Sequence, residues 1–430
     1  MGHQYQEADG DGFRGAGRYE QAGNLGGVCI GSGAGCVHGR RHRPGGAGGK
    51  HRNLPGRQGS HDGHRRDGID ARGECMIYIP PWQMKKTTAS IYGVEWDGTE
   101  TTKWARTDAS ANFTDPKPAV NNGTGSSPFD NLMPWAGMVK ETDATAGVLV
   151  KIPKFWYKWT RSGKNMKLQI ADAAVDGFHA SPAHADRGDG KGERDYVYIG
   201  RYHCASGYKS QAGSQPLGNM TRAQARTDIH NLGAVYWQSD IQLRITIWML
   251  YLVEFADWNS QKTIGYGCSP GGSRFNMGAT DAMKYHTGTN AGSRTTYGCT
   301  QYRNIEGLWD NVFDWMDGCY YNSNGLNIIK TPSQFHDSAN GIAVGVPNKG
   351  WPSVFTVSNK SGLEWVIYPT ATGGNQDTYS ADYWGFDAVY PFLRVGGASR
   401  QGQNYGLFFV TYGAVLDQSA DVGCRLQKLP

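Results

Sequence analysis

The sequence predicts an α+β domain with one core helix, short antiparallel strands and long ordered loops, preceded by a disordered N-terminal arm. Three observations predict this class. Residues 240–257 are apolar almost all round, as in a helix that is covered on most sides. Short stretches of β-branched and aromatic residues are bounded by turn residues, as strands are. After Trp258 the chain is rich in Gly, Asn, Ser and Tyr, which favours long loops that pack on the domain.

The predicted elements are given in chain order. They are a hairpin over 91–108, a strand over 147–160 interrupted at Pro153, a strand over 194–204, helices over 220–232 and 240–257, and short strands over 362–369 and 405–413. Thr221 is the expected cap of the first helix and Gly233 its stop. The sequence therefore divides into a segment 1–75, a β-rich part 76–230, and a domain 231–430 with which the β-rich part can be continuous.

The first 75 residues differ in composition from the rest. They hold 21 of the 61 glycines and half of the 12 histidines, without a period of 2 or 3.6 and with little to bury. Ordering such a segment costs about 1–2 kcal/mol per residue, so we expect disorder. Two interpretations stay open: a flexible, mildly basic arm, or translation in a non-native frame with Met76 as the natural start.

Charge and hydropathy exclude two classes of partner. A net charge of +5 over 430 residues predicts no nucleic-acid binding. The longest apolar stretch, Ile245–Val253, is far shorter than a bilayer span, and the first thirty residues contain no apolar run. We therefore expect a soluble protein made in the cytoplasm, without membrane insertion.

Cysteine spacing indicates neither a zinc ribbon nor a redox motif. No two cysteines form a CxxC pair, and the spacing favours buried thiols over one or two disulfides. The cysteines lie at positions 29, 36, 75, 204, 268, 299, 319 and 424.

Residues 186–195, "DRGDGKGERD", carry four acidic side chains but do not place them as a calcium loop requires. A turn between strands is the preferred interpretation, and the sequence predicts no cofactor. A structural calcium ion stays open without a motif to support it. The Arg187-Gly188-Asp189 tripeptide is too short to indicate receptor binding.

Motifs for catalysis are absent as well. There is no GxSxG elbow, and His203 and Cys204 are adjacent on a predicted strand, so their side chains point to opposite faces. Asp310, Asp314 and Asp317 are three or four residues apart and can share a helical face, yet glycoside hydrolysis needs carboxylates on both sides of a substrate. Structural roles are preferred for these acids. The "LRVGG" stretch at 393–397 lacks phosphate-loop spacing.

Three phrases in one order carry a family resemblance. They are "YLVEFADWNSQKTIGYG" (251–267), "NVFDW" (311–315) and "FLRVGG…VGCRL" (392–397 and 422–426). This order resembles the formylglycine-generating-enzyme branch of the C-type lectin-like fold. Within that branch, five phrases resemble tail proteins of phages and prophages of gut bacteria, including variable proteins of diversity-generating retroelements. They are "IPKFWYKWT" (152–160), "DRGDGKGERD" (186–195), "VEFADWNSQKTIGYG" (253–267), "TQYRNIEGLWDNVFDW" (300–315) and "YPFLRVGG" (390–397). The residues that match the scaffold motifs are Trp309, Asn311, Asp314, Trp315, Arg394, Gly396, Gly397, Gly423 and Arg425.

The resemblance implies a C-type lectin-like domain that binds a host bacterial surface protein or glycan at the tip of a virion tail, beside other tail proteins. The enzymes of this branch use a cysteine pair, and no pair among Cys268, Cys299, Cys319 and Cys424 has that spacing. We therefore expect no enzyme. A metal-dependent oxidase of the formylglycine-generating or sulfoxide-synthase type is one alternative, and a purely structural tail protein is another. A homotrimer stays open, since no heptad or repeat indicates it.

A binding face is expected at about residues 380–426, where core and polar residues alternate. Tyr beside small polar residues is typical of adaptable binding surfaces such as antibody paratopes. The predicted contact residues are Ser399, Arg400, Gln403, Asn404, Tyr405, Thr411, Tyr412, Asp417, Gln418 and Asp421.

Overall fold

A computed structural model of the chain describes residues 68–69, 75–76, 88–267, 273–338, 341–399 and 405–430. The chain divides into two compact units, Met1–Tyr78 and Ile79–Pro430. In the first unit, β1 (Gly68–Ile69) pairs antiparallel with β2 (Cys75–Met76). The rest of the segment 1–75, for which the sequence predicts disorder, lies outside the described residues.

The α+β prediction is wrong. Among the described residues, strand accounts for 32% and helix for 11%, so the second unit is mostly β. The error has a physical cause: many strands are only two to four residues long and lie in the Gly- and Asn-rich stretches that sequence patterns assign to loops. A strand this short has no room for the alternation that would reveal it.

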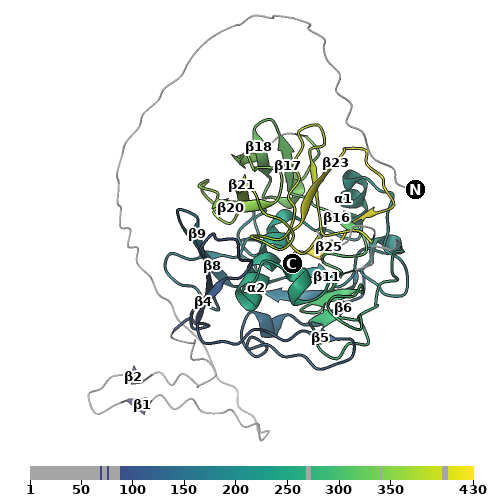
Figure 1. The fold of residues 1–430 in the computed structure, drawn as a ribbon. Helices are drawn as coiled ribbons and strands as arrows, with labels where there is room; N and C mark the ends of the chain where they lie inside the picture. The colour runs from purple at the N-terminus through teal and green to yellow at the C-terminus, as the bar shows by residue number, and fades with distance from the viewer. Residues whose placement is uncertain (1–67, 70–74, 77–87, 268–272, 339–340, 400–404) are drawn as a thin grey trace, which may run out of the picture. The chain divides into compact units, whose positions relative to one another are not determined.

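Two five-stranded sheets contain most of the N-terminal half of this unit (Figure 1). The first has the order β10 (His179–Ala180), β8 (Trp156–Ser162), β9 (Asn165–Ala171), β3 (Ile91–Trp96), β4 (Ala105–Asp108). The second has the order β12 (Tyr236–Gln238), β25 (Leu426–Lys428), β11 (Tyr196–Gly200), β7 (Gly147–Pro153), β6 (Lys140–Asp143). The second sheet joins strands from before and after residue 230, so the chain is continuous across that position.

Smaller sheets form the remainder. One has the order β15 (Ile305–Glu306), β14 (Thr300–Tyr302), β13 (Gly288–Thr289), β5 (Ala119–Val120), and another β23 (Val410–Gly413), β22 (Phe392–Val395), β16 (Phe313–Trp315), β24 (Val422–Gly423). A third contains β17 (Cys319–Asn322), β18 (Gly325–Ile328) and β19 (Ile342–Gly345), and a fourth β20 (Pro352–Val357) and β21 (Ile367–Thr372). In Figure 1 the strands β17, β18, β20, β21 and β23 lie together in the upper part of the second unit.

Both predicted helices are confirmed. α1 (Arg222–His230) begins after Thr221, whose hydroxyl accepts a hydrogen bond from the backbone N–H of Gln224. α2 (Ile241–Phe255) begins after Asp240, whose carboxylate caps Leu243. Such caps satisfy backbone groups that have no partner inside the helix. A third, short helix is α3 (Ser260–Thr263), and 3₁₀ turns occupy Trp135–Gly137, Ser206–Tyr208 and Pro332–Gln334.

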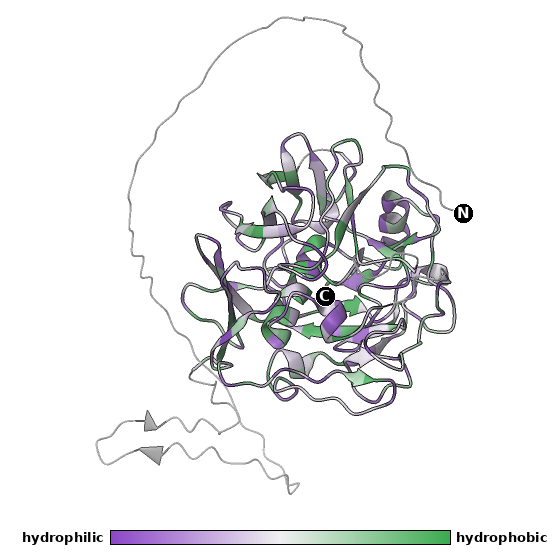
Figure 2. Cartoon of the chain, viewed as in Figure 1, coloured by the Kyte–Doolittle hydropathy of each residue, from purple (hydrophilic) through white to green (hydrophobic). Residues whose placement is uncertain are grey.

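The core surrounds α2. All fifteen of its residues are buried, which agrees with a helix that is apolar all round. Figure 2 shows hydrophobic residues on this helix and on the strands near it, in the interior of the view. At its C-terminal end, Trp258 stacks on Phe355 with ring centroids 5.0 Å apart, and Phe408 meets the same indole edge to face. None of the described helices is long and apolar enough to cross a membrane.

The predicted strands are partly confirmed. β3 and β4 form the expected hairpin, with a loop of residues 97–104 in place of a tight Asp-Gly turn. The stretch 147–160 is interrupted after Pro153, and its two halves, β7 and β8, belong to different sheets. Pro153 thus ends one sheet strand and lets the chain cross to the other sheet, because proline cannot continue a ladder.

Candidate functional site

The predicted contact residues lie on and around one antiparallel hairpin. β22 and β23 pair from Phe392↔Gly413 to Val395↔Val410. The connection between them includes residues 400–404, so the predicted contacts Arg400, Gln403 and Asn404 lie outside the described residues.

The structure buries some of the predicted contacts. Ser399 is fully buried, and its backbone N–H donates to the carbonyl of Asn311 at 3.1 Å, so its side chain has no access to a ligand. Tyr405 is half-buried, and its ring lies 4.3 Å from that of Phe409, edge to face. Burial raises the pKa of Tyr405 above its usual value. These two residues are thus tied to the interior of the hairpin more than the sequence predicts.

Thr411 and Tyr412 are neighbours on β23 and therefore point to opposite faces of the strand. Thr411 lies opposite Arg394, which forms an ion pair with Asp417 at 2.9 Å. Tyr412 lies on the other face. The predicted set is consequently split between two surfaces, with Gln418 exposed and Asp421 half-buried in the segment after β23.

On its own face, Tyr412 belongs to an aromatic pair. Its ring stacks on Tyr390, with centroids 5.7 Å apart and planes 13° from parallel. The Lys349 ammonium lies 5.2 Å from the centre of the Tyr412 ring, a cation–π distance. Neither partner could be predicted from the sequence, because Lys349 is distant in the chain and Tyr390 stands in an apolar stretch before Pro391.

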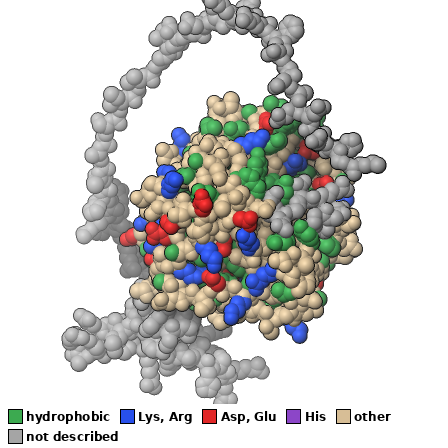
Figure 3. Space-filling model, viewed as in Figure 1, with side chains coloured by type: hydrophobic (Ala, Val, Ile, Leu, Met, Phe, Trp, Pro, Cys, Tyr) green, Lys and Arg blue, Asp and Glu red, His purple; other side chains and the backbone are tan. Residues whose placement is uncertain are grey.

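Exposed apolar side chains adjoin this pair. Pro391 and Gly413 form a β-bridge. The residues just before Pro391 and those just after Gly413 therefore lie at the same end of the hairpin. Val389 is 77% exposed and Leu416 81% exposed, and Val415 is also exposed. We call this set the hairpin-end surface: Lys349, Val389, Tyr390, Tyr412, Val415 and Leu416. Figure 3 shows hydrophobic side chains gathered on the viewed face over the region of β23.

The motif residues upstream form a rigid support for the hairpin. Trp309 and Trp315 are buried, and their indole N–H groups donate to the carbonyls of Gly265 and Met220 at 3.1 and 3.0 Å. The Asn311 side chain both accepts from the backbone N–H of Phe275 and donates to its carbonyl. Backbone groups that would otherwise be buried without partners are thereby satisfied.

Glycines allow the hairpin to approach this support closely. Gly396 has a φ of +72°, and a Cβ there would lie 2.8 Å from the carbonyl oxygen of Leu308. The space at Gly397 and Gly423 is as restricted. A Cβ at Gly397 would lie 2.8 Å from the Tyr405 side chain, and a Cβ at Gly423 would lie 2.6 Å from the Leu217 carbonyl oxygen. A side chain at any of these three positions would push the strands apart.

A buried charge cluster lies beneath the same sheet. The Asp314 carboxylate accepts from His203 Nδ1 at 2.9 Å and from Arg425 Nε at 3.3 Å. Burial alone would raise the pKa of Asp314, but its interactions with His203 and Arg425 lower that pKa to about 2. Arg425 also donates to the carbonyls of Gly200 and Arg201, each at 3.0 Å. Two further carbonyls, of Glu306 and Gly307, accept from it at 2.9 and 3.0 Å.

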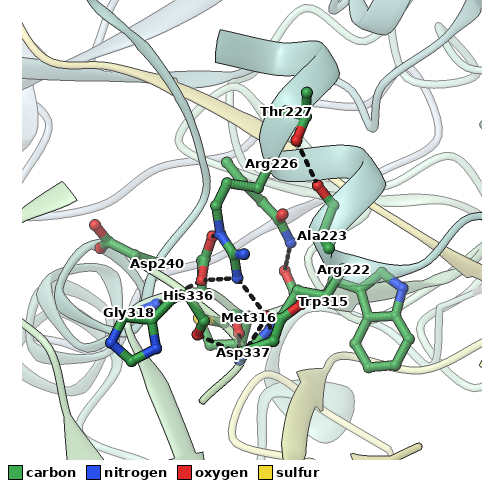
Figure 4. A network of polar contacts seen from close by, with 12 residues as sticks. Arg222, Ala223, Arg226, Thr227, Asp240, Trp315, Met316, Gly318, His336 and Asp337 are labelled. Atoms are coloured by element: carbon green, nitrogen blue, oxygen red, sulfur yellow. Dashed lines mark hydrogen bonds and ion pairs between the residues drawn. The ribbon is translucent and has the colours of Figure 1, made fainter. Parts of the chain in front are cut away.

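The three acids of the motif do not share a helical face, because β16 and the turns beside it replace the helix. Asp310 accepts from the backbone N–H of Thr300 at 2.8 Å, and burial raises its pKa to about 6. Asp317 receives a two-pronged ion pair from Arg226 of α1, at 2.6 and 2.9 Å. Figure 4 shows this region, where Arg222 and Arg226 both reach from α1 to Asp337. Arg222 also donates to the carbonyls of Met316 and Cys319. Asp317 thus holds α1 in place, and Asp310 holds the backbone at Thr300.

The acidic segment 186–195 is occupied by internal ion pairs. Arg187 is fully buried against the carboxylate of Asp240, and Asp189 pairs with Arg194. Asp195 pairs with Lys154 at 2.8 Å. Within the described ranges no three His, Cys, Asp or Glu side chains gather as metal ligands. The Arg187-Gly188-Asp189 tripeptide cannot present its arginine to a receptor, since that side chain is enclosed.

His184, next to this segment, is fully buried in its neutral form. Its Nδ1 lies 2.6 Å from the hydroxyl of Ser181 and its Nε2 2.9 Å from the carbonyl of Ile152. Both contacts are satisfied when Ser181 donates to Nδ1 and Nε2–H donates to the carbonyl. Burial lowers the pKa of His184 to about 3.

We expect His184 to make the protein sensitive to acid. Above pH 6.5 the histidine is neutral in both states and contributes no pH dependence. Between pH 6.5 and 3 the unfolded chain takes up a proton that the folded protein excludes. The free energy of unfolding therefore decreases by about 1.4 kcal/mol for each unit by which the pH is lowered. Urea unfolding at pH 7.5 and 5.0 should show wild type losing about 2 kcal/mol more than His184→Gln. Equal losses in both proteins would contradict the assignment.

Of the four cysteines considered for an oxidase, the three that the structure describes are buried. Cys319 lies in β17 and Cys424 directly follows β24, while Cys268 lies outside the described residues. Burial raises the pKa of the Cys319 and Cys424 thiols, and the thiol of Cys424 is in hydrogen-bond contact with Cys204. Cys299 is buried as well, beside β14. A buried thiol with a raised pKa is a poor nucleophile and a poor metal ligand.

No protein-family model matches this sequence, and no curated protein is significantly similar to it.

Proposed function

We propose that this chain is a phage or prophage tail protein that binds a ligand on the host bacterial surface through the hairpin-end surface. The proposal places it in the virion tail, beside other tail proteins, as a binding protein without catalysis. The observation that carries it is the group of exposed apolar and aromatic side chains on a tightly held hairpin. The sequence phrases that resemble phage tail proteins support the same function.

The chemistry of the hairpin-end surface supports binding. Exposed apolar residues cost solubility and contribute nothing to folding where they stand, so a group of them favours an interaction site. The stacked rings of Tyr390 and Tyr412 offer rigid contact area, and ordering a Tyr side chain costs little entropy. Lys349 adds a charged donor for a polar ligand group. A bacterial surface protein or glycan can use both kinds of contact.

The rigidity of the support matters to this function. Gly396, Gly397, Trp315 and Arg425 hold the hairpin from below, and none of them contributes to the exposed surface. Exposed side chains can therefore change without disturbing the fold. A protein whose ligand contacts vary between relatives needs this separation. A template repeat beside a reverse-transcriptase gene near the coding sequence would establish retroelement diversification.

Serine substitutions in the hairpin-end surface should weaken host binding. We expect Val389→Ser and Leu416→Ser each to weaken binding at least about tenfold, since a buried contact of this size contributes about 1.5–3 kcal/mol. The measurement is flow cytometry of the labelled protein on a panel of gut bacterial strains. Tyr412→Ala should behave in the same way.

Val139→Ser is the matched control, because Val139 is also an exposed valine, 45% accessible, and it belongs to another part of the chain. All variants should unfold at the wild-type temperature. Strains that bind wild type and Val389→Ser equally well would overturn the proposed surface. The proposed surface would also be overturned if Val139→Ser weakened binding as much as Val389→Ser does.

A further inference from the structure

A polar cavity lies at the C-terminal end of α2. It has a volume of about 580 Å³, within the range of small-molecule sites. Six separate segments form its walls: the loop 97–104, the stretch after β4, the end of α2, α3, the connection between β13 and β14 that contains Arg294, and the loop that contains Asp377. None of these segments belongs to the hairpin-end surface, so the inference goes beyond the proposed function.

The floor of the cavity is fixed by backbone hydrogen bonds. The N–H of Trp104 donates to the carbonyl of Ala256, and the N–H of Trp258 donates to that of Thr102, both at 2.8 Å. Asp257 is nearly buried between them, and its carboxylate accepts from the N–H of Asn259 at 2.9 Å. Because this floor is held from both sides, the cavity exists before any ligand arrives, which limits the entropy lost on binding.

The rim carries two ion pairs that stability does not explain. Lys262 and Asp377 lie 2.8 Å apart, and Lys103 and Asp115 lie 3.8 Å apart. All four side chains are more than half exposed. Ion pairs as exposed as these contribute almost nothing to folding. They do, however, place ammonium donors and carboxylate acceptors around one opening.

The charges around the cavity balance. Three cations (Lys103, Lys262 and Arg294) face three carboxylates (Asp115, Asp257 and Asp377). A phosphate or a nucleic acid would meet as many repulsive groups as attractive ones. A ligand with many hydroxyls suits this lining better, because each hydroxyl can donate to a carboxylate and accept from an ammonium group.

The space extends beyond one cavity. A second hollow of about 340 Å³ shares Thr101, Lys103 and Trp104 with the first and continues toward Glu95 and Asp97. These two carboxylates give the combined lining an excess of negative charge, which disfavours an anionic ligand further. Trp104 and Phe255 are only 5% and 4% exposed, so they add narrow apolar edges to an otherwise polar lining. Two adjoining hollows on either side of Lys103 fit a chain of linked units better than a single small molecule.

We propose that these adjoining hollows, between the loop 97–104 and the end of α2, are a binding site for a neutral saccharide chain. Asp377 and Asp257 accept hydrogen bonds from sugar hydroxyls, and Lys103 and Lys262 donate to them. Lys103 contacts the saccharide from the wall common to both hollows.

The test uses the full chain and an array of defined neutral oligosaccharides of two to six hexose or N-acetylhexosamine units, beside charged glycans. We expect binding to at least one neutral series, strengthening with length. Calorimetry with that oligosaccharide should show Asp377→Ala and Lys103→Ala weakening it at least about tenfold, since each removes a charged hydrogen-bonding group.

Asp195→Ala is the matched control, because Asp195 is likewise an exposed carboxylate 2.8 Å from a lysine, Lys154, outside the cavity. It should bind as wild type does, and so should Leu416→Ser. Binding to no neutral oligosaccharide, or to charged glycans alone, would overturn the inference. So would neutral-sugar binding that Asp377→Ala and Lys103→Ala leave unchanged. Because Leu416→Ser tests the hairpin-end surface separately, failure of one proposal is distinguishable from failure of the other.

Discussion

Replacing Arg425 with Met is expected to lower the free energy of unfolding by about 3–5 kcal/mol. The guanidinium is buried and is paired with Asp314, and it donates to four backbone carbonyls. Met fills a similar volume but leaves the carboxylate without its cation and the four carbonyl oxygens without a donor. Unpaired buried polar groups cost far more than a hydrogen bond normally contributes.

Arg394→Met is the comparison for this experiment. Arg394 also belongs to the closing motif and pairs with Asp417, but both side chains are partly accessible to water. We expect it to cost about 1 kcal/mol or less, as surface ion pairs do. Urea titration of the two variants measures the difference. Equal losses would show that the buried cluster is not what joins β16 to the C-terminal strands.

The second large effect is expected at Glu254. This buried carboxylate accepts from Arg303 Nε at 3.0 Å and from the hydroxyl of Tyr302 at 3.0 Å, and Arg303 makes a further ion pair with it. Glu254→Gln removes the charge and turns an amide N–H₂ toward groups that already donate. We expect a loss of about 3–5 kcal/mol, because the Arg303 guanidinium stays buried without its main counter-charge.

A double variant separates the charge from the space it fills. In Glu254→Met with Arg303→Met, two apolar side chains of similar volume replace the ion pair. Such replacements are often neutral, so we expect the double variant to unfold at a higher urea concentration than Glu254→Gln alone. A double variant that is the less stable of the two would mean that the ion pair itself, and not the avoidance of an unpaired charge, stabilises this end of α2.

The helices could be predicted from the sequence because their signals are local. Thr221 and Asp240 mark the starts, and the uninterrupted apolar run after Asp240 requires burial on all sides. The fold class could not be predicted in the same way. β24 has two residues and β16 has three, and their partners lie far along the chain, so no window of sequence shows that they are strands.

Only part of the hairpin-end surface could be predicted from the sequence. Tyr412 was predicted from its polar and aromatic character, whereas Val389 and Leu416 look like core residues in the sequence and prove exposed. Ser399 is the converse: a small polar residue that the packing of Asn311 and the glycines encloses. Exposure depends on how strands pair, and the bridge between Pro391 and Gly413 has no sequence signature.

The place of β25 has a consequence for biosynthesis. This strand, Leu426–Lys428, lies between β12 and β11, which are about 190 and 230 residues earlier in the chain. A nascent chain still held in the ribosome short of Lys428 cannot complete that sheet, and β11 and β12 have an unsatisfied edge until then. Exposed strand edges invite pairing with other chains. The interval between synthesis of β12 and release of β25 is therefore when this protein most needs a chaperone.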